Sequence, residues 1–197
     1  MRRGVRIQNL GGALAVLLHR PHPTVQALTR QLEAIGLNVA IAWPELPPTS
    51  LAADFVFFDA DMGHSAQFPW PEGEPPVPLI ALIGSEAPGR IEWSLLAGAH
   101  AQLLKPVGDS GAYSALLIAR AAFDAQHAMQ AKIEDLQNRV NARMTVVKAV
   151  MRLAARGKSE AEAYAQLRHM AMAWRISFEE AAERIVGPDA SDERDAQ

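Results

Sequence analysis

The chain has no cysteine among its 197 residues. Disulfide bonds, thiolate metal sites and cysteine nucleophiles are therefore excluded. Long hydrophobic runs are also missing near the N-terminus, because the apolar stretch at residues 13–18 ends at His19-Arg20-Pro21. That stretch is too short for a signal sequence or a membrane-spanning helix. We therefore expect a soluble cytoplasmic protein without a membrane partner.

The usual sequence signatures of catalysis are absent as well. The six histidines are scattered without metal-ligand spacing, and no serine stands in a nucleophile-elbow pattern. No glycine-rich phosphate loop follows a predicted strand. We therefore expect neither enzymatic activity nor a metal ion or cofactor.

Charge is distributed unevenly along the chain. Hydrophobic residues make up 49% of the sequence, which is enough for a folded core, and the net charge is only −3. Up to Ala131 there are eight basic and eleven acidic residues, whereas residues 132–186 contain ten basic and seven acidic ones. This positive segment suggests a polyanionic partner. The acidic tail at residues 188–197 is predicted to be disordered.

Short apolar segments recur through the first 110 residues. The predicted strands are residues 13–18, 38–43, 55–58, 79–83 and 101–104, the predicted helices are 23–35 and 89–97, and the predicted loops are 44–49 and the proline-rich 67–78. Strands that alternate with helices at this spacing indicate βαβ units, and hence a parallel sheet covered on both faces. In such a sheet the loops at the carboxyl ends of the strands gather at one edge, where sites are built.

A single long helix is predicted from about residue 110 to residue 156, because no proline or glycine follows Gly111 in this stretch. Ordinary globular helices run 8–20 residues, so this length indicates a coiled coil or a connecting rod. Apolar residues alternate in steps of three and four, with one gap at Arg143, along Met129, Ile133, Leu136, Val140, Val147 and Val150. This pattern predicts a parallel homodimeric coiled coil, and a helix packed on its own domain is the alternative.

Two short helices are predicted after Gly157. Ser159 and Glu162 form a capping-box pattern, and Ser177 begins the last helix, which runs to Val186. Helices of this size need the end of the long helix to close a core, so the C-terminal domain is predicted to begin near Val140. The predicted divisions are residues 1–110, a linker helix at 111–139, a three-helix domain at 140–187, and the tail.

Two segments of the first domain carry a family resemblance. Phe57-Phe58-Asp59-Ala60-Asp61-Met62 and the stretch from Gly98 to Lys105-Pro106 resemble the third and fifth strands of response-regulator receiver domains. The resemblance implies a five-stranded parallel, flavodoxin-like α/β fold. It also places Asp59 at the phosphoacceptor position and Lys105 at the position of the phosphate-contacting lysine, followed by a cis peptide bond before Pro106.

The departures from the receiver pattern concern the chemistry of phosphorylation. The acidic pair that holds Mg²⁺ is replaced by His19 and Arg20, the hydroxyl after the fourth strand by Ile83-Gly84 with Ser85 too late, and the aromatic residue of the fifth strand by Gln102. Phosphoryl transfer relies on a cation to offset the charge on the transferring oxygens. We therefore predict a pseudo-receiver, in which Asp59 caps its strand or bonds to Lys105.

Residues 136–186 resemble the ANTAR domain, the RNA-binding three-helix module of transcription antiterminators. The resemblance rests on the pattern Gly157-x-Ser159-Glu160-x-Glu162-Ala163-Tyr164-x-x-Leu167-Arg168-x-x-Ala171-Met172. A pseudo-receiver, a coiled coil and an ANTAR domain together resemble the AmiR/NasT antiterminators, and most closely the amide-responsive branch. In that branch a ligand-sensing partner protein, rather than phosphate, silences the receiver.

The resemblance implies a surface that binds the loops of leader-RNA hairpins, whose unstacked bases stack on aromatic or guanidinium groups. The candidate residues are Arg143, Lys148, Arg152, Arg156, Lys158, Arg168 and Arg175, with Tyr164 and Trp174 as stacking platforms. The i, i+4, i+8 spacing of Lys148, Arg152 and Arg156 predicts one basic stripe. The alternative is a solvated helix face with Tyr164 in the core.

The expected partners are therefore leader-RNA stem-loops, a second copy of the chain and a ligand-sensing regulatory protein. Two other functions remain open. One is a DNA-binding two-component response regulator, although residues 177–186 contain Arg184 as their only basic residue. The other is a protein-only interaction module that dimerises without binding nucleic acid.

Overall fold

The computed structural model describes residues 10–187, so the predicted disorder of the acidic tail lies outside the described residues. The contacts divide the chain into two compact units, Met1–His127 and Ala128–Gln197. This division falls within the long helix. The boundaries that we predicted after residues 110 and 139 remain predictions.

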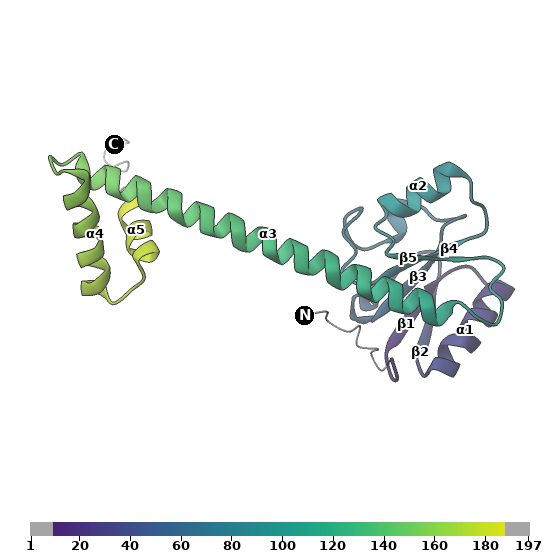
Figure 1. Ribbon diagram of the computed structural model, residues 1–197. Coiled ribbons are helices and arrows are strands. Elements are labelled where there is room, and N and C mark those ends of the chain that lie inside the picture. Colours follow the sequence, from purple (N-terminus) through teal and green to yellow (C-terminus); the bar gives the residue numbers. More distant parts are fainter. Residues whose placement is uncertain (1–9, 188–197) are drawn as a thin grey trace, which may run out of the picture. The chain divides into compact units, whose positions relative to one another are not determined.

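Unit 1 is built on a parallel sheet with the strand order β2-β1-β3-β4-β5 (Figure 1). The strands are β1 (Leu14–Leu18), β2 (Asn38–Ala42), β3 (Phe55–Asp59), β4 (Leu79–Ile83) and β5 (Ala101–Leu104). Every residue of β3 and β4 is buried, as expected for apolar strands with both faces covered. The predicted five-stranded parallel, receiver-like fold is confirmed.

Helices cover the two faces of the sheet unequally. Helix α1 (Pro23–Ile35) and the first turns of α3 (Ala112–Ala154) pack on one face, where Leu28 and Leu116 join the core around Phe57. On the other face the only α-helix within the described residues is α2 (Pro88–Leu96). The rest of that face is covered by loops that contain two short 3₁₀ helices, η1 (Pro48–Ala52) and η2 (Ser65–Gln67).

Aromatic side chains fill the space over the second face. Phe68 stacks against Trp70 and Trp93, and it meets the ring of Phe58 edge-on at a centroid distance of 5.4 Å. The prolines of residues 69–78 prevent an α-helix here, so rings carried on a loop complete the core instead. The proline-rich loop was predicted, whereas η1 begins inside the predicted loop at residues 44–49 and was missed.

Helix α3 is one continuous helix of 43 residues, two residues shorter at each end than predicted. Gly111, with a φ of 107°, precedes it, and the chain turns after Ala154 through Gly157, with a φ of 83°. Both glycines adopt left-handed backbone angles that favour this residue, and they mark the turns before and after the helix. The peptide bond between Lys105 and Pro106 is cis, as predicted.

Unit 2 closes a small core between the end of α3, α4 (Glu160–Trp174) and α5 (Phe178–Val186). Leu153, Leu167 and Ala181 are among its buried residues. Both predicted helix starts are confirmed, and Ser159 and Ser177 each form a full capping box. Hydrogen bonds from the Ser159 backbone N–H and hydroxyl lower the pKa of the exposed Glu162. Within residues 10–187, no helix is long and apolar enough to cross a membrane.

Candidate functional site

A small group of ionisable side chains of unit 1 meets at the carboxyl edge of the sheet. His19 follows β1, Asp59 ends β3, and Lys105 follows β5. Because all five strands are parallel, these three positions lie at the same edge although they are far apart in the sequence. The structure therefore brings the predicted pair Asp59 and Lys105 together. It also places His19, which replaces an expected acidic metal ligand, beside Asp59.

Asp59 is enclosed by the side chains of Lys105 and His19. Its side chain is 2% exposed, and the ammonium Nζ of Lys105 donates to its Oδ1 at 2.6 Å. The Nε2 atom of His19 lies 3.2 Å from Oδ2, which is an ion-pair distance without hydrogen-bond alignment. The Nδ1 atom of His19 lies 2.7 Å from the carbonyl oxygen of Arg20, so Nδ1 carries a proton. Both carboxylate oxygens of Asp59 are thus taken by side chains of the protein itself.

Asp61 is a further member of this cluster, and the sequence analysis gave it no role. Lys105 bridges to it, with 2.6 Å between Nζ and Oδ2. The backbone N–H groups of Gly84 and Ser85 donate to its two oxygens at 2.8 and 3.0 Å. The signal available in the sequence was a second carboxylate two residues after Asp59, in the turn that follows β3.

The residues of this edge do not fit a magnesium ion. Mg²⁺ takes oxygen ligands in near-octahedral geometry. Here an imidazole stands against Asp59, and one lysine ammonium joins Asp59 to Asp61. Among residues 10–187 no group of three or more His, Cys, Asp or Glu side chains is placed to hold a metal ion. One ammonium thus bridges two carboxylates at the place where three strands meet.

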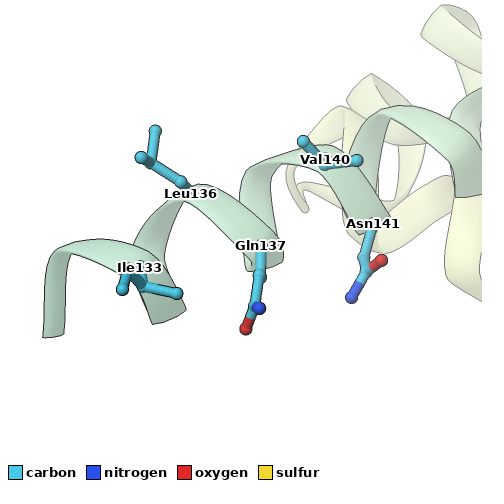
Figure 2. Close-up of a pocket in the computed structure, with 5 residues that line it drawn as sticks. All are labelled: Ile133, Leu136, Gln137, Val140 and Asn141. Atoms are coloured by element: carbon cyan, nitrogen blue, oxygen red, sulfur yellow. The ribbon is translucent and has the colours of Figure 1, made fainter. Parts of the chain in front are cut away.

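The predicted dimer seam is an exposed apolar stripe on α3. The five predicted residues are between 41% and 63% exposed: Met129, Ile133, Leu136, Val140 and Val147. A hollow of about 480 Å³ lies along this helix. Figure 2 shows Leu136 and Val140 on one side of the helix and Gln137 and Asn141 on another. Val150, which continued the apolar pattern, is buried in the core of unit 2 instead. The residues of this pattern are therefore exposed up to Val147, whereas Val150 joins the core.

The predicted basic surface of unit 2 is largely exposed to solvent. The exposed members are Arg143, Lys148, Arg156, Lys158, Arg168 and Arg175. Two of them have structural roles as well: Lys158 donates to the side-chain oxygen of Gln166 at 2.6 Å, and Arg175 ends α4 with a φ of 56°. Arg152 differs from the others, because its guanidinium is half-buried and donates to the carbonyl oxygen of Ile185 at 3.0 Å. It therefore secures the end of α5.

Tyr164 lies at the surface rather than in the core. Its side chain is half-exposed, and its ring contacts Phe178 at a centroid distance of 5.0 Å. It borders a groove of about 360 Å³ between α3 and α4, and Arg168 follows it one turn later on α4. Trp174 is also partly exposed, with the guanidinium of Arg184 over its ring. The alternative with Tyr164 in the core is wrong.

A receiver-like sheet whose two edge carboxylates are bridged by a lysine, followed by an exposed basic three-helix unit, defines the class of receiver-based regulators. The chain belongs to the AmiR family with a C-terminal ANTAR domain, since the family model for the AmiR N-terminal region matches residues 14–120 and the ANTAR domain model matches residues 134–186. The family resemblance seen in the sequence is confirmed. These families are regulatory.

The chain is similar to individual curated proteins and solved structures. The aliphatic amidase regulator of Pseudomonas aeruginosa is 26% identical over 181 residues, which cover 89% of this chain and 92% of that protein. Among solved structures, ShkA Rec1 in complex with c-di-GMP is 26% identical with a TM-score of 0.41, covering 55% of this chain and 93% of that one. The response regulator ChrA of a heme-sensing two-component system is 22% identical with a TM-score of 0.41, covering 90% of this chain and 97% of that one.

Proposed function

We propose that the protein is a cytoplasmic transcription antitermination regulator that binds a leader-RNA hairpin through unit 2. The observation that carries this proposal is the ANTAR match over residues 134–186, where six predicted cationic side chains are exposed. A protein that traps a nascent hairpin prevents the terminator from folding. Tyr164 and Arg168, exposed one turn apart on α4, offer a ring and a guanidinium on which unstacked loop bases stack.

DNA reading by the last helix is the weaker alternative. A recognition helix contacts base edges and phosphates with basic and amide side chains. Helix α5 instead presents Glu179, Glu180 and Glu183, and its one arginine, Arg184, stacks on Trp174. The charge of α5 therefore opposes insertion into a groove of the duplex.

The test is a gel shift over a salt series, with a leader RNA that carries two hexaloop stems and the matching DNA duplex as competitor. We expect loop-dependent RNA binding with a log–log salt slope of roughly −3 to −4, from about five phosphate contacts. Lys148→Ala and Arg168→Ala weaken binding and each reduces the slope by roughly 0.7. Arg30→Ala, an exposed charge on α1, is the control. Arg152 is unsuitable because it holds the end of α5.

The alternatives predict other outcomes of the same experiment. Equal affinity for the DNA duplex identifies a DNA-binding response regulator. Intact dimers that bind neither RNA nor DNA identify a protein-only interaction module. RNA binding that Lys148→Ala, Arg168→Ala and Arg30→Ala weaken to the same extent shows non-specific attraction rather than a site in unit 2.

We further propose that control of the RNA-binding unit does not run through phosphorylation of Asp59 but through a ligand-sensing partner protein. The enclosure of Asp59 by Lys105 and His19 supports this proposal, because His19 and Arg20 occupy the positions of the acidic pair and Lys105 already binds the carboxylate. Incubation with labelled acetyl phosphate and Mg²⁺ is expected to leave the chain unlabelled. Label that disappears in Asp59→Asn contradicts the proposal.

A further inference from the structure

His100 joins two strands at the amino edge of the sheet, opposite the edge that carries Asp59. Its ring nitrogen Nδ1 accepts the backbone N–H of Leu79, the first residue of β4, at 3.1 Å. Its own backbone N–H donates to the carbonyl oxygen of Leu79 at 2.8 Å. Because an N–H group points at Nδ1, this nitrogen carries no proton, and the ring is the neutral form protonated on Nε2. The start of β4 is thus bonded to the residue before β5.

Helix α3 passes beside this histidine at the end of unit 1. The ring of Phe123 meets the ring of His100 edge-on at a centroid distance of 5.2 Å. The ring of His127 follows at 4.1 Å from that of Phe123. The side chain of Gln126 hydrogen-bonds to the His100 ring. Since unit 1 ends at His127, the contact involves the last turn of α3 that belongs to this unit.

The surroundings of His100 favour its neutral ring. Burial lowers the pKa of His100, the hydrogen bond with Gln126 raises it, and the charge of His127 lowers it, so that the pKa lies below the usual 6.5. An unfolded chain therefore takes up a proton at a higher pH than the folded one. The stability that His100 contributes is complete above the usual histidine pKa, and it is lost as the pH falls toward the pKa of the folded state.

The charged groups around the ring would not stabilise a proton on it. Among the described residues no carboxylate forms an ion pair with His100. Helix α2 contributes the uncharged Ser94 and Leu95 to the hollow that His100 lines, and β4 contributes only a backbone N–H. On α3, Arg120 pairs with the carboxylate that precedes β3. His127 is the titratable neighbour that acts on His100, and its charge has the same sign.

We propose that His100 is a pH-sensitive clasp between the amino edge of the sheet and α3. The neutral ring accepts the N–H of Leu79 and packs against Phe123, so the clasp is closed. When the ring takes up a proton at mildly acidic pH, two N–H groups face each other at Nδ1, and the ring repels His127. The bond to Leu79 and the contact with α3 are then lost together. The proposal concerns unit 1 and does not depend on RNA binding.

The test is amide hydrogen exchange at Leu79 in the full-length chain, at about pH 7.5 and about pH 5, on either side of the usual histidine pKa. Leu79 is the only leucine that follows a proline, so carbonyl-¹³C proline with ¹⁵N leucine identifies its amide. We expect the protection factor, which corrects for intrinsic exchange at each pH, to fall roughly tenfold or more on acidification, because the amide loses its acceptor. The nuclear Overhauser effect between the rings of His100 and Phe123 disappears over the same range.

Three variants separate the clasp from a general effect of acid. His100→Asn places an oxygen that does not titrate near the position of Nδ1, so protection of the Leu79 amide no longer depends on pH. His100→Phe keeps a ring against Phe123 without an acceptor, so protection is low at both pH values. His127→Gln removes the like charge and moves the midpoint to higher pH. The control is His169→Gln, at an exposed position of α4, which responds as the wild type does.

The result that overturns the proposal is defined for each protein. Equal protection of the Leu79 amide at both pH values in the wild type shows that His100 is no switch. A fall on acidification that persists in His100→Asn and in His100→Phe shows that acid loosens unit 1 by another route. An unchanged midpoint in His127→Gln shows that the two histidines do not repel each other. Circular dichroism at both pH values verifies that each variant is folded.

Discussion

Leu136→Glu is expected to convert the protein from a dimer into monomers. Leu136 lies in the centre of the exposed stripe on α3, and the proposed two-fold seam buries this residue twice. Burial of a leucine stabilises by about 2 kcal/mol, so two copies contribute about 4 kcal/mol, which weakens dimerisation roughly a thousandfold when they are lost. The buried glutamates add repulsion to this loss. Sedimentation equilibrium of both proteins measures the change.

The same substitution is expected to weaken binding of a two-stem leader RNA roughly a hundredfold, because two linked sites gain from effective concentration and single sites do not. Binding of a one-stem RNA stays within about threefold of the wild type. The matched control is Asn138→Glu, which adds the same charge at an exposed position outside the stripe. A wild type that sediments as a monomer contradicts the seam. A Leu136→Glu dimer as tight as that of Asn138→Glu also contradicts it.

The strands of unit 1 were predictable because their apolar runs are short and bounded by breakers. Phe55-Val56-Phe57-Phe58 forms a strand with no exposed residue, as a two-sided parallel strand requires. The covering of the second face was less predictable. The ring of Phe68 packs between residues of three separate segments, and no local periodicity records such long-range contacts.

In the candidate sites, too, residues that belong to a local sequence motif were predictable, whereas residues whose role depends on tertiary contacts were not. Asp59 and Lys105 were found from strand-end motifs, and their 2.6 Å contact follows from the parallel sheet. Asp61 was missed because its role depends on backbone N–H groups, which any sequence supplies. Arg152 fits a basic stripe by spacing, yet α5 ends beside it and accepts its hydrogen bond. The spacing of residues along one helix does not predict contacts with another helix, such as α5.

Lys105→Met is expected to destabilise unit 1 by about 3–5 kcal/mol, the usual cost of leaving a buried charge without its partner. Lys105 is the ammonium that joins Asp59 and Asp61, and Asp59 is almost fully buried. Its removal leaves two neighbouring carboxylates without an ammonium between them, and Asp59 keeps only the imidazole of His19 as a side-chain contact. Methionine keeps most of the volume of the aliphatic stem, so the loss reports charge rather than packing.

Urea unfolding followed by tryptophan fluorescence measures this loss in a Trp174→Phe background, where the remaining tryptophans, Trp43, Trp70 and Trp93, all lie in unit 1. Adding Asp59→Asn to Lys105→Met is expected to recover a substantial part of the stability, because the two residues are in direct contact and their effects are not additive. Arg30→Met, at an exposed position of α1, controls for the loss of a surface charge. A loss below about 1 kcal/mol, or no recovery with Asp59→Asn, shows that Lys105 does not neutralise a buried carboxylate.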